Sequence, residues 1–274
     1  MQKDIKKRFS IINNAEAELS KNLSSTQSDI YVEIVKILDS FSTLSGNLIY
    51  DRQAINLINQ AEQQIRIAIN KSDYPERVKD YLLNFDKIRE QNILVQKSLN
   101  KIDITSVGLT SLQQSAVQLT TNSLVGNGLD VNFIQPVKDA LFQHVVAGAS
   151  IADTEIALRN LIKGDETLGL FQRYVTQISR DSISQYDGLI QSRIMNEFDL
   201  DGYSYEGSII HDSRAQCRRW VEMGEIKFED LEAELNWAYS NGSGMIPNTT
   251  KDTFPINRGG YNCRHFATAI RILD

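Results

Sequence analysis

Apolar residues recur at intervals of three and four along the first hundred residues, a spacing typical of amphipathic helices. The first apolar stripe consists of Ile30, Ile34, Ile37, Leu38 and Phe41. The second consists of Ile55, Ile58, Ile65 and Ile69. Tyr74–Pro75 begins a third helix, because proline fits the first turn of a helix and little else within it. The pattern therefore predicts consecutive helices over residues 28–102, arranged as a bundle or a long hairpin.

A stretch rich in Ser, Thr, Gly and Asn follows these helices. It covers residues 103–130 and contains Gly108, Gly126 and Gly128. Such composition favours turns and irregular structure. We therefore expect a connector here, with a soft boundary near Ile104.

The remaining sequence changes from a helical to an alternating pattern. Three further helices are expected over Pro136–Gly148, Ala152–Lys163 and Leu168–Phe198. After Asp201–Gly202 the alternation of Tyr203, Tyr205, Gly207 and Ile209 with polar residues indicates a strand. A short helix from Phe228 to Tyr239 and a closing strand from Phe266 to Leu273 complete the expected elements.

The expected fold is therefore a mainly α N-terminal helical bundle followed by a small α+β C-terminal module. That module combines a long helix, short strands and a pair of loops that act as a clasp. Three consecutive regions are expected: residues 1–104 as the bundle or hairpin, 105–167 as connector and helices, and 168–274 as the C-terminal domain.

Composition and charge narrow the class of protein. Of the 274 residues, 41% are hydrophobic and 23% are charged, which is typical of a globular protein. The net charge of -6 disfavours a free-standing nucleic-acid binder, because phosphate contacts are made mainly by clustered Lys and Arg. No apolar run approaches the roughly 18 residues of a membrane span. We expect neither a membrane span nor an export signal.

The scarce reactive residues lie in two short C-terminal segments. Residues 211–218 contain His211 and Cys217, and residues 258–265 contain Cys263 and His265. These are two of the three histidines and both cysteines of the chain. Chance would seldom gather four such residues in this way. We therefore expect the two segments to meet in space.

Several chemistries would join the segments. A disulfide between Cys217 and Cys263 would close a loop of about 45 residues and stabilise the fold by about 4 kcal/mol. A zinc ion could instead be bound by His211, Cys217, Cys263 and His265, a set of two thiolates and two imidazoles. Reduced, buried cysteines and hydrogen-bonded histidines that brace a loop are a third interpretation. A catalytic thiol–imidazole pair oriented by Asp212 is a fourth.

Arginines and glycines are concentrated in the same two segments. Arg214, Arg218, Arg219, Arg258 and Arg264 could present a cationic patch to phosphate or to partner carboxylates. They could equally pair internally with Asp212, Glu222, Glu225 and Asp252. Gly259–Gly260 predicts a tight turn, since glycine adopts positive φ at little cost.

The order of these residues resembles a known family. Asp212, Arg214 and Cys217 form an Asp-x-Arg-x-x-Cys segment, and residues 262–265 read Asn-Cys-Arg-His, with Asn262 and Arg264 in the motif. This pattern is similar to the head-morphogenesis domain typified by the F protein of phage Mu, over about residues 168–273. Here Arg218-Arg219-Trp220 follows the first cysteine and His265 ends the second motif, where many members carry further cysteines.

The resemblance implies a structural minor capsid protein of a tailed bacteriophage. Such a protein would be made in the cytoplasm of the bacterial host and reside in the virion, beside the portal or in the inner head. Portal and capsid proteins would be its partners, together with packaged DNA, and no residue would be catalytic. The alternatives are a Cys–His enzyme or toxin-like domain delivered with phage DNA, and a zinc-stabilised binding module.

Overall fold

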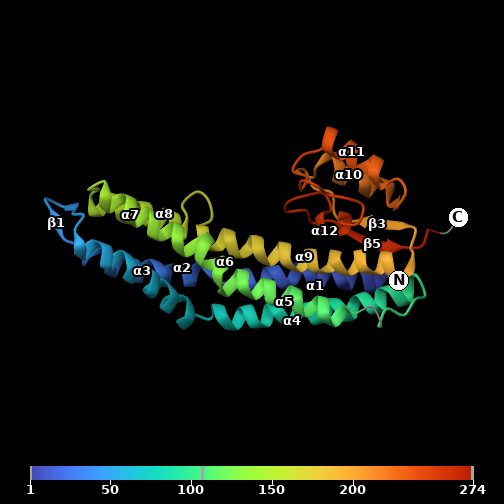
Figure 1. Cartoon of the computed structure of the whole chain (residues 1–274), viewed down its shortest axis with the longest axis horizontal. Coiled ribbons are helices and arrows are strands. Elements are labelled where there is room, and N and C mark those ends of the chain that lie inside the picture. The colour runs from blue at the N-terminus through green and yellow to red at the C-terminus, as the bar shows by residue number, and fades with distance from the viewer. Residues whose placement is uncertain (1, 106–107, 273–274) are drawn as a thin grey trace. The chain divides into compact units, whose positions relative to one another are not determined.

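The computed structural model describes residues 2–105 and 108–272, which form a mainly helical protein (Figure 1). The chain divides into two compact units. Unit 1 comprises Met1–Asn14, Leu83–Gln118 and Arg180–Asp274, and unit 2 comprises Ala15–Leu82 and Leu119–Ser179. Both units combine stretches that are distant in the sequence, whereas the three regions expected from the sequence are consecutive.

Four helices form the bundle of unit 2. They are α2 (Leu23–Leu38), α3 (Arg52–Lys71), α7 (Gln135–Val146) and α8 (Ile151–Lys163). Helix α2 packs on α3 and α8, and α7 also packs on α3 and α8. The hairpin of β1 (Thr43–Leu44) and β2 (Asn47–Leu48) joins α2 to α3. The bundle thus takes two helices from the first hundred residues and two from beyond residue 130.

Side-chain caps fix where two of these helices begin. The Asp51 side chain accepts a hydrogen bond from the Ala54 amide at the start of α3. Ser150 does the same for the Asp153 amide at the start of α8. These bonds satisfy amides that have no partner within the helix. These two polar residues therefore set where α3 and α8, and the apolar stripes that they carry, begin.

Unit 2 also contains parts of four longer helices. These are α1 (Gln2–Ser20), α4 (Tyr74–Leu99), α5 (Leu109–Val125) and α9 (Leu170–Phe198). A short helix, α6 (Asn127–Leu129), leads into the π-helical turn η1 (Asp130–Ile134). Phe171 packs against both Tyr74 and Phe133, with ring centroids 5.1 Å apart in each pair. This aromatic cluster is fully buried and forms part of the core of unit 2.

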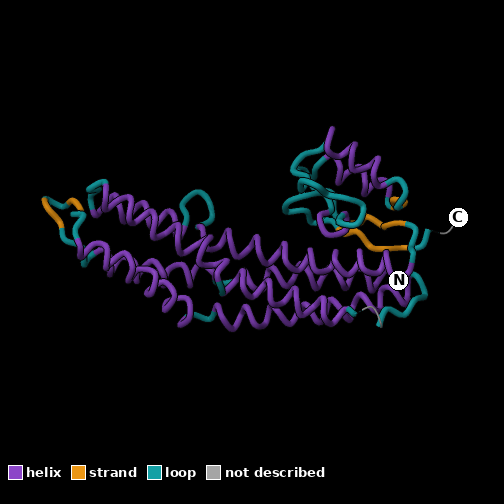
Figure 2. The backbone as a smooth tube through the Cα atoms, in the orientation of Figure 1, coloured by secondary structure: helices purple, strands orange, loops and turns teal. Residues whose placement is uncertain are grey.

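Unit 1 contains the remaining parts of these long helices and a small α+β module. Its sheet has the order β4-β3-β5, with β3 (Gly202–Glu206) central and antiparallel to both neighbours. The outer strands are β4 (Glu225–Lys227) and β5 (Phe266–Ile270). Three helices accompany the sheet: α10 (Ala215–Met223), α11 (Leu231–Asn241) and α12 (Phe254–Asn257). Figure 2 shows that the strands form only a small part of the chain.

Strand β5 is buried along its whole length and is attached to the helices of unit 1 by polar contacts. The amide of Ala269 donates to the Gln191 side chain of α9, and Gln96 of α4 donates to the Ala269 carbonyl. Phe266 stacks on Phe9 of α1 with ring centroids 4.1 Å apart. The last strand is therefore fixed to residues from the beginning and middle of the chain.

Several elements confirm the predictions from the sequence. A bundle followed by a small module with a long helix and short strands is the architecture observed. Helix α4 begins at Tyr74, and α7, α8 and α9 occupy the three predicted segments within a few residues. Strands β3 and β5 lie within the two segments predicted to be extended.

Other expectations were wrong. Most of the predicted connector over residues 103–130 is helix α5, whose buried Leu109, Thr120 and Leu124 lie on one face among small polar residues. Those residues lower helix propensity but leave this face intact. Helix α1 was not predicted, although Ile5, Ile12 and Leu19 form a buried stripe. Helix α10 was also missed, because its segment was expected to be one of the two loops of the clasp.

A search of the described helices for a long, apolar span found none that could cross a membrane.

Candidate functional site

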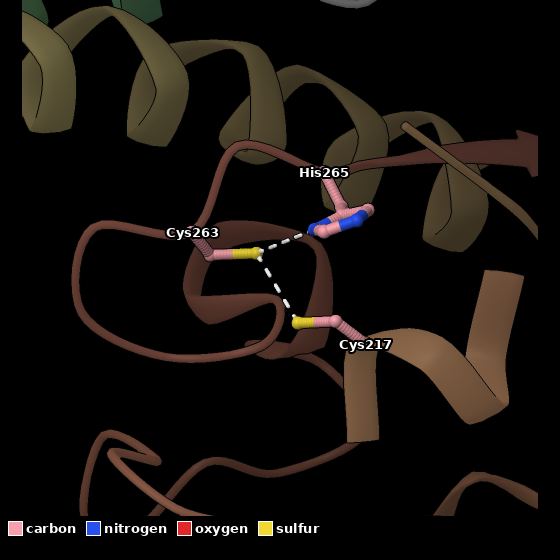
Figure 3. Close-up of side chains that lie close together, drawn as sticks. All are labelled: Cys217, Cys263 and His265. Carbon is pink, nitrogen blue, oxygen red and sulfur yellow. Dashed lines mark hydrogen bonds between the residues drawn. The ribbon is translucent and has the colours of Figure 1, made fainter. Parts of the chain in front are cut away.

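Two thiols and one imidazole converge inside the module of unit 1 (Figure 3). Cys217 lies in the first turn of α10, Cys263 in the loop after α12, and His265 directly before β5. The two Sγ atoms are 3.9 Å apart, and Cys263 Sγ lies 3.6 Å from His265 Nδ1. All three residues are buried, so the cluster is closed to solvent.

Tyr205 of β3 completes the surroundings of the two sulfur atoms. Its hydroxyl donates to Cys217 Sγ at 3.7 Å and lies 3.5 Å from Cys263 Sγ. Its ring stacks on His265 with centroids 5.6 Å apart. From the sequence, Tyr205 was predicted only to be an apolar strand position. The alternating pattern gave the correct inward face but no indication that the hydroxyl would face the thiols.

Gly259 and Gly260 lie against this cluster, and each position requires glycine for a different reason. Gly260 has φ +102°, in the region that favours glycine, as expected for a tight turn. At Gly259 the limit is space, because an added Cβ would lie 2.2 Å from Cys217 Sγ. No larger residue fits at Gly259 while the two segments keep this contact.

Arg214 and Gln216 hold the two segments together. Arg214 donates to the carbonyl oxygens of Gly259, at 2.9 Å, and Tyr261. Gln216, fully buried, donates to the Gly259 carbonyl at 3.0 Å and to the Ser243 carbonyl at 2.7 Å. The expected meeting of the two segments is therefore confirmed, and Gln216 is a member that the sequence analysis missed.

Asn262 and Arg264 occupy exposed positions in the second segment. Asn262 has φ +58°, a left-handed conformation that asparagine tolerates better than most residues. This backbone turn lies between Gly260 and Cys263, whose amide donates to the Gly260 carbonyl. The asparagine of the motif therefore serves the loop conformation, and Cys263 points inward as a result.

The two thiols behave as a coupled pair. The hydrogen bond from Cys217 lowers the pKa of Cys263 well below its usual range, helped by His265 and by the positive charge of Arg258. The same bond, together with burial, raises the pKa of Cys217. Burial also raises the pKa of Tyr205 well above 10. Cys263 is therefore the thiol of the pair that ionises more readily.

Two buried polar groups beside the cluster lack hydrogen-bond partners among the described residues. They are Nε2 of His265, and Nε and Nη1 of Arg258. Arg258 is only 4% exposed, so it cannot contact a partner or phosphate as the sequence analysis allowed. A buried positive charge is costly unless negative charge lies nearby. The positive charge of Arg258 is one of the causes that lower the pKa of Cys263.

His211 does not belong to the cluster, which corrects the four-residue zinc set. Its side chain is 99% exposed and pairs with Asp212, whose carboxylate lies 2.8 Å from His211 Nδ1. Asp212 is itself 87% exposed. It therefore does not orient the imidazole of buried His265, as the catalytic interpretation required. His211 lies at a loop that turns outward. The spacing of residues in the sequence did not reveal this direction.

Arg218 and Arg219 make their contacts within the module. Arg218 donates to the carbonyl oxygens of Ile210, His211 and Ser213. Arg219 forms a bidentate pair with Glu234, with both nitrogen–oxygen distances 2.7 Å. Arg219 therefore forms an internal ion pair, but with Glu234 and not with one of the four carboxylates named from the sequence, and Arg218 binds main-chain carbonyls instead. The expected contact of Arg218 and Arg219 with an external anion is not supported.

The cysteines are free thiols in this structure. Their sulfur separation of 3.9 Å is well beyond the roughly 2.05 Å of a disulfide bond. The structure therefore does not contain the disulfide bond of the first alternative. The three converging side chains agree with both the buried-thiol and the metal alternatives.

Comparisons of the chain with protein-family models, with curated proteins and with solved structures found no match.

Proposed function

We propose that the chain is a structural minor capsid protein of a tailed bacteriophage, a head-morphogenesis protein associated with the portal or the inner head. It would assist head assembly or DNA packaging. The proposal rests on the Asp212–Cys217 and Asn262–His265 motifs and on their resemblance to the Mu F-type domain. The contact between the two motifs is the observation that carries it.

This contact gives both motifs a shared architectural role. Arg214 binds the main chain of the second segment, and Cys217 lies against Cys263. Asn262 supplies the left-handed turn that directs Cys263 inward. Each motif residue in this set shapes or closes the loops. Such a clasp is what a structural protein needs.

The same geometry argues against a hydrolase or toxin-like enzyme. A nucleophilic thiol must be reached by its substrate, but Cys217 and Cys263 are 2% and 5% exposed. The imidazole of His265 is stacked on Tyr205, and Asp212 lies in an exposed pair with His211. The described residues near the thiols thus offer no orienting carboxylate in contact with His265.

Exposed apolar side chains in unit 2 support a protein partner such as the portal or a capsid subunit. Tyr50 and Phe142 are 52% and 44% exposed, and their rings meet edge to face at 6.1 Å. Leu44 in the β1–β2 hairpin is 72% exposed. Apolar groups gathered on a surface are typical of interaction sites. Contact with packaged DNA would be local, given the net charge of -6.

The test is made in the phage or prophage that encodes the chain. We expect the protein to be detected by mass spectrometry in purified heads, at fewer copies than the major capsid protein. Deleting its gene should lower the yield of infectious, DNA-filled particles, and a plasmid copy should restore that yield. Heads that lack the protein in the wild type, together with normal yields after deletion, would contradict the proposal.

A further inference from the structure

We propose that Cys217, Cys263, His265 and Tyr205 form a tetrahedral zinc site inside unit 1. The ligand atoms are the two Sγ atoms, an imidazole nitrogen and the phenol oxygen Oη. The inference does not depend on the head-assembly role, since it rests only on the geometry and charge of these side chains.

The distances match the edges of a zinc tetrahedron. With Zn–S of about 2.3 Å and Zn–N of about 2.1 Å, a tetrahedral site places two sulfurs about 3.8 Å apart and sulfur and nitrogen about 3.6 Å apart. The corresponding distances here are 3.9 Å between the sulfurs and 3.6 Å from Cys263 Sγ to His265 Nδ1. The ligand atoms of Cys217, Cys263 and His265 all lie within 4.8 Å of one another.

Tyr205 occupies the fourth direction. A Zn–O bond of about 2.0–2.2 Å would place the oxygen about 3.5–3.7 Å from each sulfur. The Tyr205 hydroxyl lies 3.5 Å from Cys263 Sγ and 3.7 Å from Cys217 Sγ. Both oxygen–sulfur distances therefore fit a fourth ligand, which would leave no open coordination position. A closed site is typical of structural zinc rather than catalytic zinc.

Charge balance favours the phenolate as that ligand. Two thiolates and one phenolate carry three negative charges, which balance Zn²⁺ and the buried guanidinium of Arg258. A neutral assembly avoids the cost of an uncompensated charge in the interior. Zinc entry displaces the remaining thiol and phenol protons to solvent, as metal binding to such ligands requires.

The surrounding loops hold the ligands in place before metal arrives. The main chain at Gly259 lies against both sulfurs, since an added Cβ would be 2.2 Å from Cys217 Sγ and 3.1 Å from Cys263 Sγ. Arg214 and Gln216 fix the Gly259 carbonyl. Sulfur and imidazole ligands in a tetrahedral arrangement select zinc over magnesium or calcium, which prefer oxygen ligands. The chemistry of the donor set therefore indicates zinc.

The first experiment is elemental analysis of the full chain, purified without a metal-affinity step. We expect about one zinc per chain. Cys217→Ser, Cys263→Ser and His265→Ala should each lose most of that zinc. His211→Ala is the matched control, since it removes an exposed histidine of the same module and should keep the metal. Zinc absent from the wild type, or lost equally in His211→Ala, would overturn the proposal.

A second measurement begins with the wild-type protein, so its first result does not depend on whether a variant folds. The zinc of the wild-type protein is exchanged for Co²⁺, and the absorption spectrum is recorded. Tetrahedral thiolate coordination should give sulfur-to-cobalt charge-transfer bands together with intense visible bands. Tyr205→Phe should retain a thiolate–cobalt spectrum but bind zinc at least about tenfold more weakly, because one ligand is lost. A wild-type spectrum without charge-transfer bands overturns the site, and unchanged zinc affinity in Tyr205→Phe removes the phenol from the ligand set.

Discussion

Arg8 of α1 donates a hydrogen bond from Nη2 to Oγ1 of Thr268 in β5, at 2.6 Å and across 260 positions of the chain. The same guanidinium donates to Asn92 of α4 at 3.0 Å and lies 3.5 Å from the Asp187 carboxylate of α9. Arg8 is fully buried and Asp187 is 2% exposed. The first helix of the chain is thus fixed to the last strand of the module that carries the clasp.

We expect Arg8→Met to destabilise the protein strongly. The substitution leaves the Asp187 carboxylate buried without its cation, which costs about 3–5 kcal/mol of unfolding free energy. Urea unfolding of the full chain measures the change. The control is Arg193→Met, because Arg193 forms an exposed pair with Glu197 and should change stability by less than about 1 kcal/mol. Equal effects of the two variants would contradict a buried role for Arg8.

Gly259→Ala should disrupt the clasp. Its added methyl group would lie 2.2 Å from Cys217 Sγ, so the second segment must move away from α10. We expect a loss of at least about 3 kcal/mol of unfolding free energy, at the upper end of overpacking effects. Gly46→Ala is the comparison, since its φ is also positive, at +83°, but nothing lies within 4 Å of the added carbon. It should cost only about 1–2 kcal/mol.

Glu234 gives the module a pH dependence in the acid range. Its bidentate bond with Arg219 lowers the pKa of Glu234 below 4.5, and the Trp220 indole contributes by donating a further hydrogen bond. A lowered folded-state pKa means that this stabilisation is present above the unfolded pKa and is lost as pH falls through the folded value. We therefore expect wild-type stability to fall steadily below about pH 4.5.

The matched variants for this pH effect are Glu234→Gln and Glu232→Gln, since the second changes an exposed carboxyl of the same helix. Unfolding free energy measured at a series of pH values should become flatter below about pH 4.5 in Glu234→Gln only. A Glu234→Gln curve that still falls as steeply as that of the wild type would show that other carboxyls control the acid response.

Arg214→Lys should loosen the second segment without unfolding the module. A lysine ammonium cannot reproduce the planar fork that binds the Gly259 and Tyr261 carbonyls. We expect the amides of Gly260 and Cys263 to exchange with solvent at least about tenfold faster, equivalent to about 1.4 kcal/mol of local stability. Arg264→Lys changes an exposed arginine of the same segment and should leave this exchange unchanged.

The sequence was informative wherever one face of an element is clearly apolar. Helices α4, α7, α8 and α9 and strands β3 and β5 carry such patterns and were predicted. Helix α5 was not, because its buried face includes Thr120 and is surrounded by Ser, Thr and Asn. In α1, the buried stripe includes Arg8, a residue that ordinarily indicates a solvated face. Tertiary pairing with Asp187 explains this exception.

The meeting of the two segments was predicted from the sequence, but the set of residues that form the candidate site was not. Pairing of the two segments follows from scarce residues placed in matching motifs, and Cys217, Cys263 and His265 do converge. His211 does not, since its direction depends on a loop whose backbone carbonyls are held by Arg218. Tyr205 and Gln216 join the site through strand and helix packing that spacing in the sequence does not encode.

X-ray absorption spectroscopy at the zinc edge, recorded on the full-length protein, tests the central claim that the two segments form one metal-bound clasp. We expect two sulfur neighbours at about 2.3 Å and two nitrogen or oxygen neighbours at about 2.0–2.2 Å. The Tyr205→Phe variant should keep both sulfurs while its oxygen neighbour is replaced by solvent or lost. A protein without zinc, or a first shell without sulfur, would contradict the account.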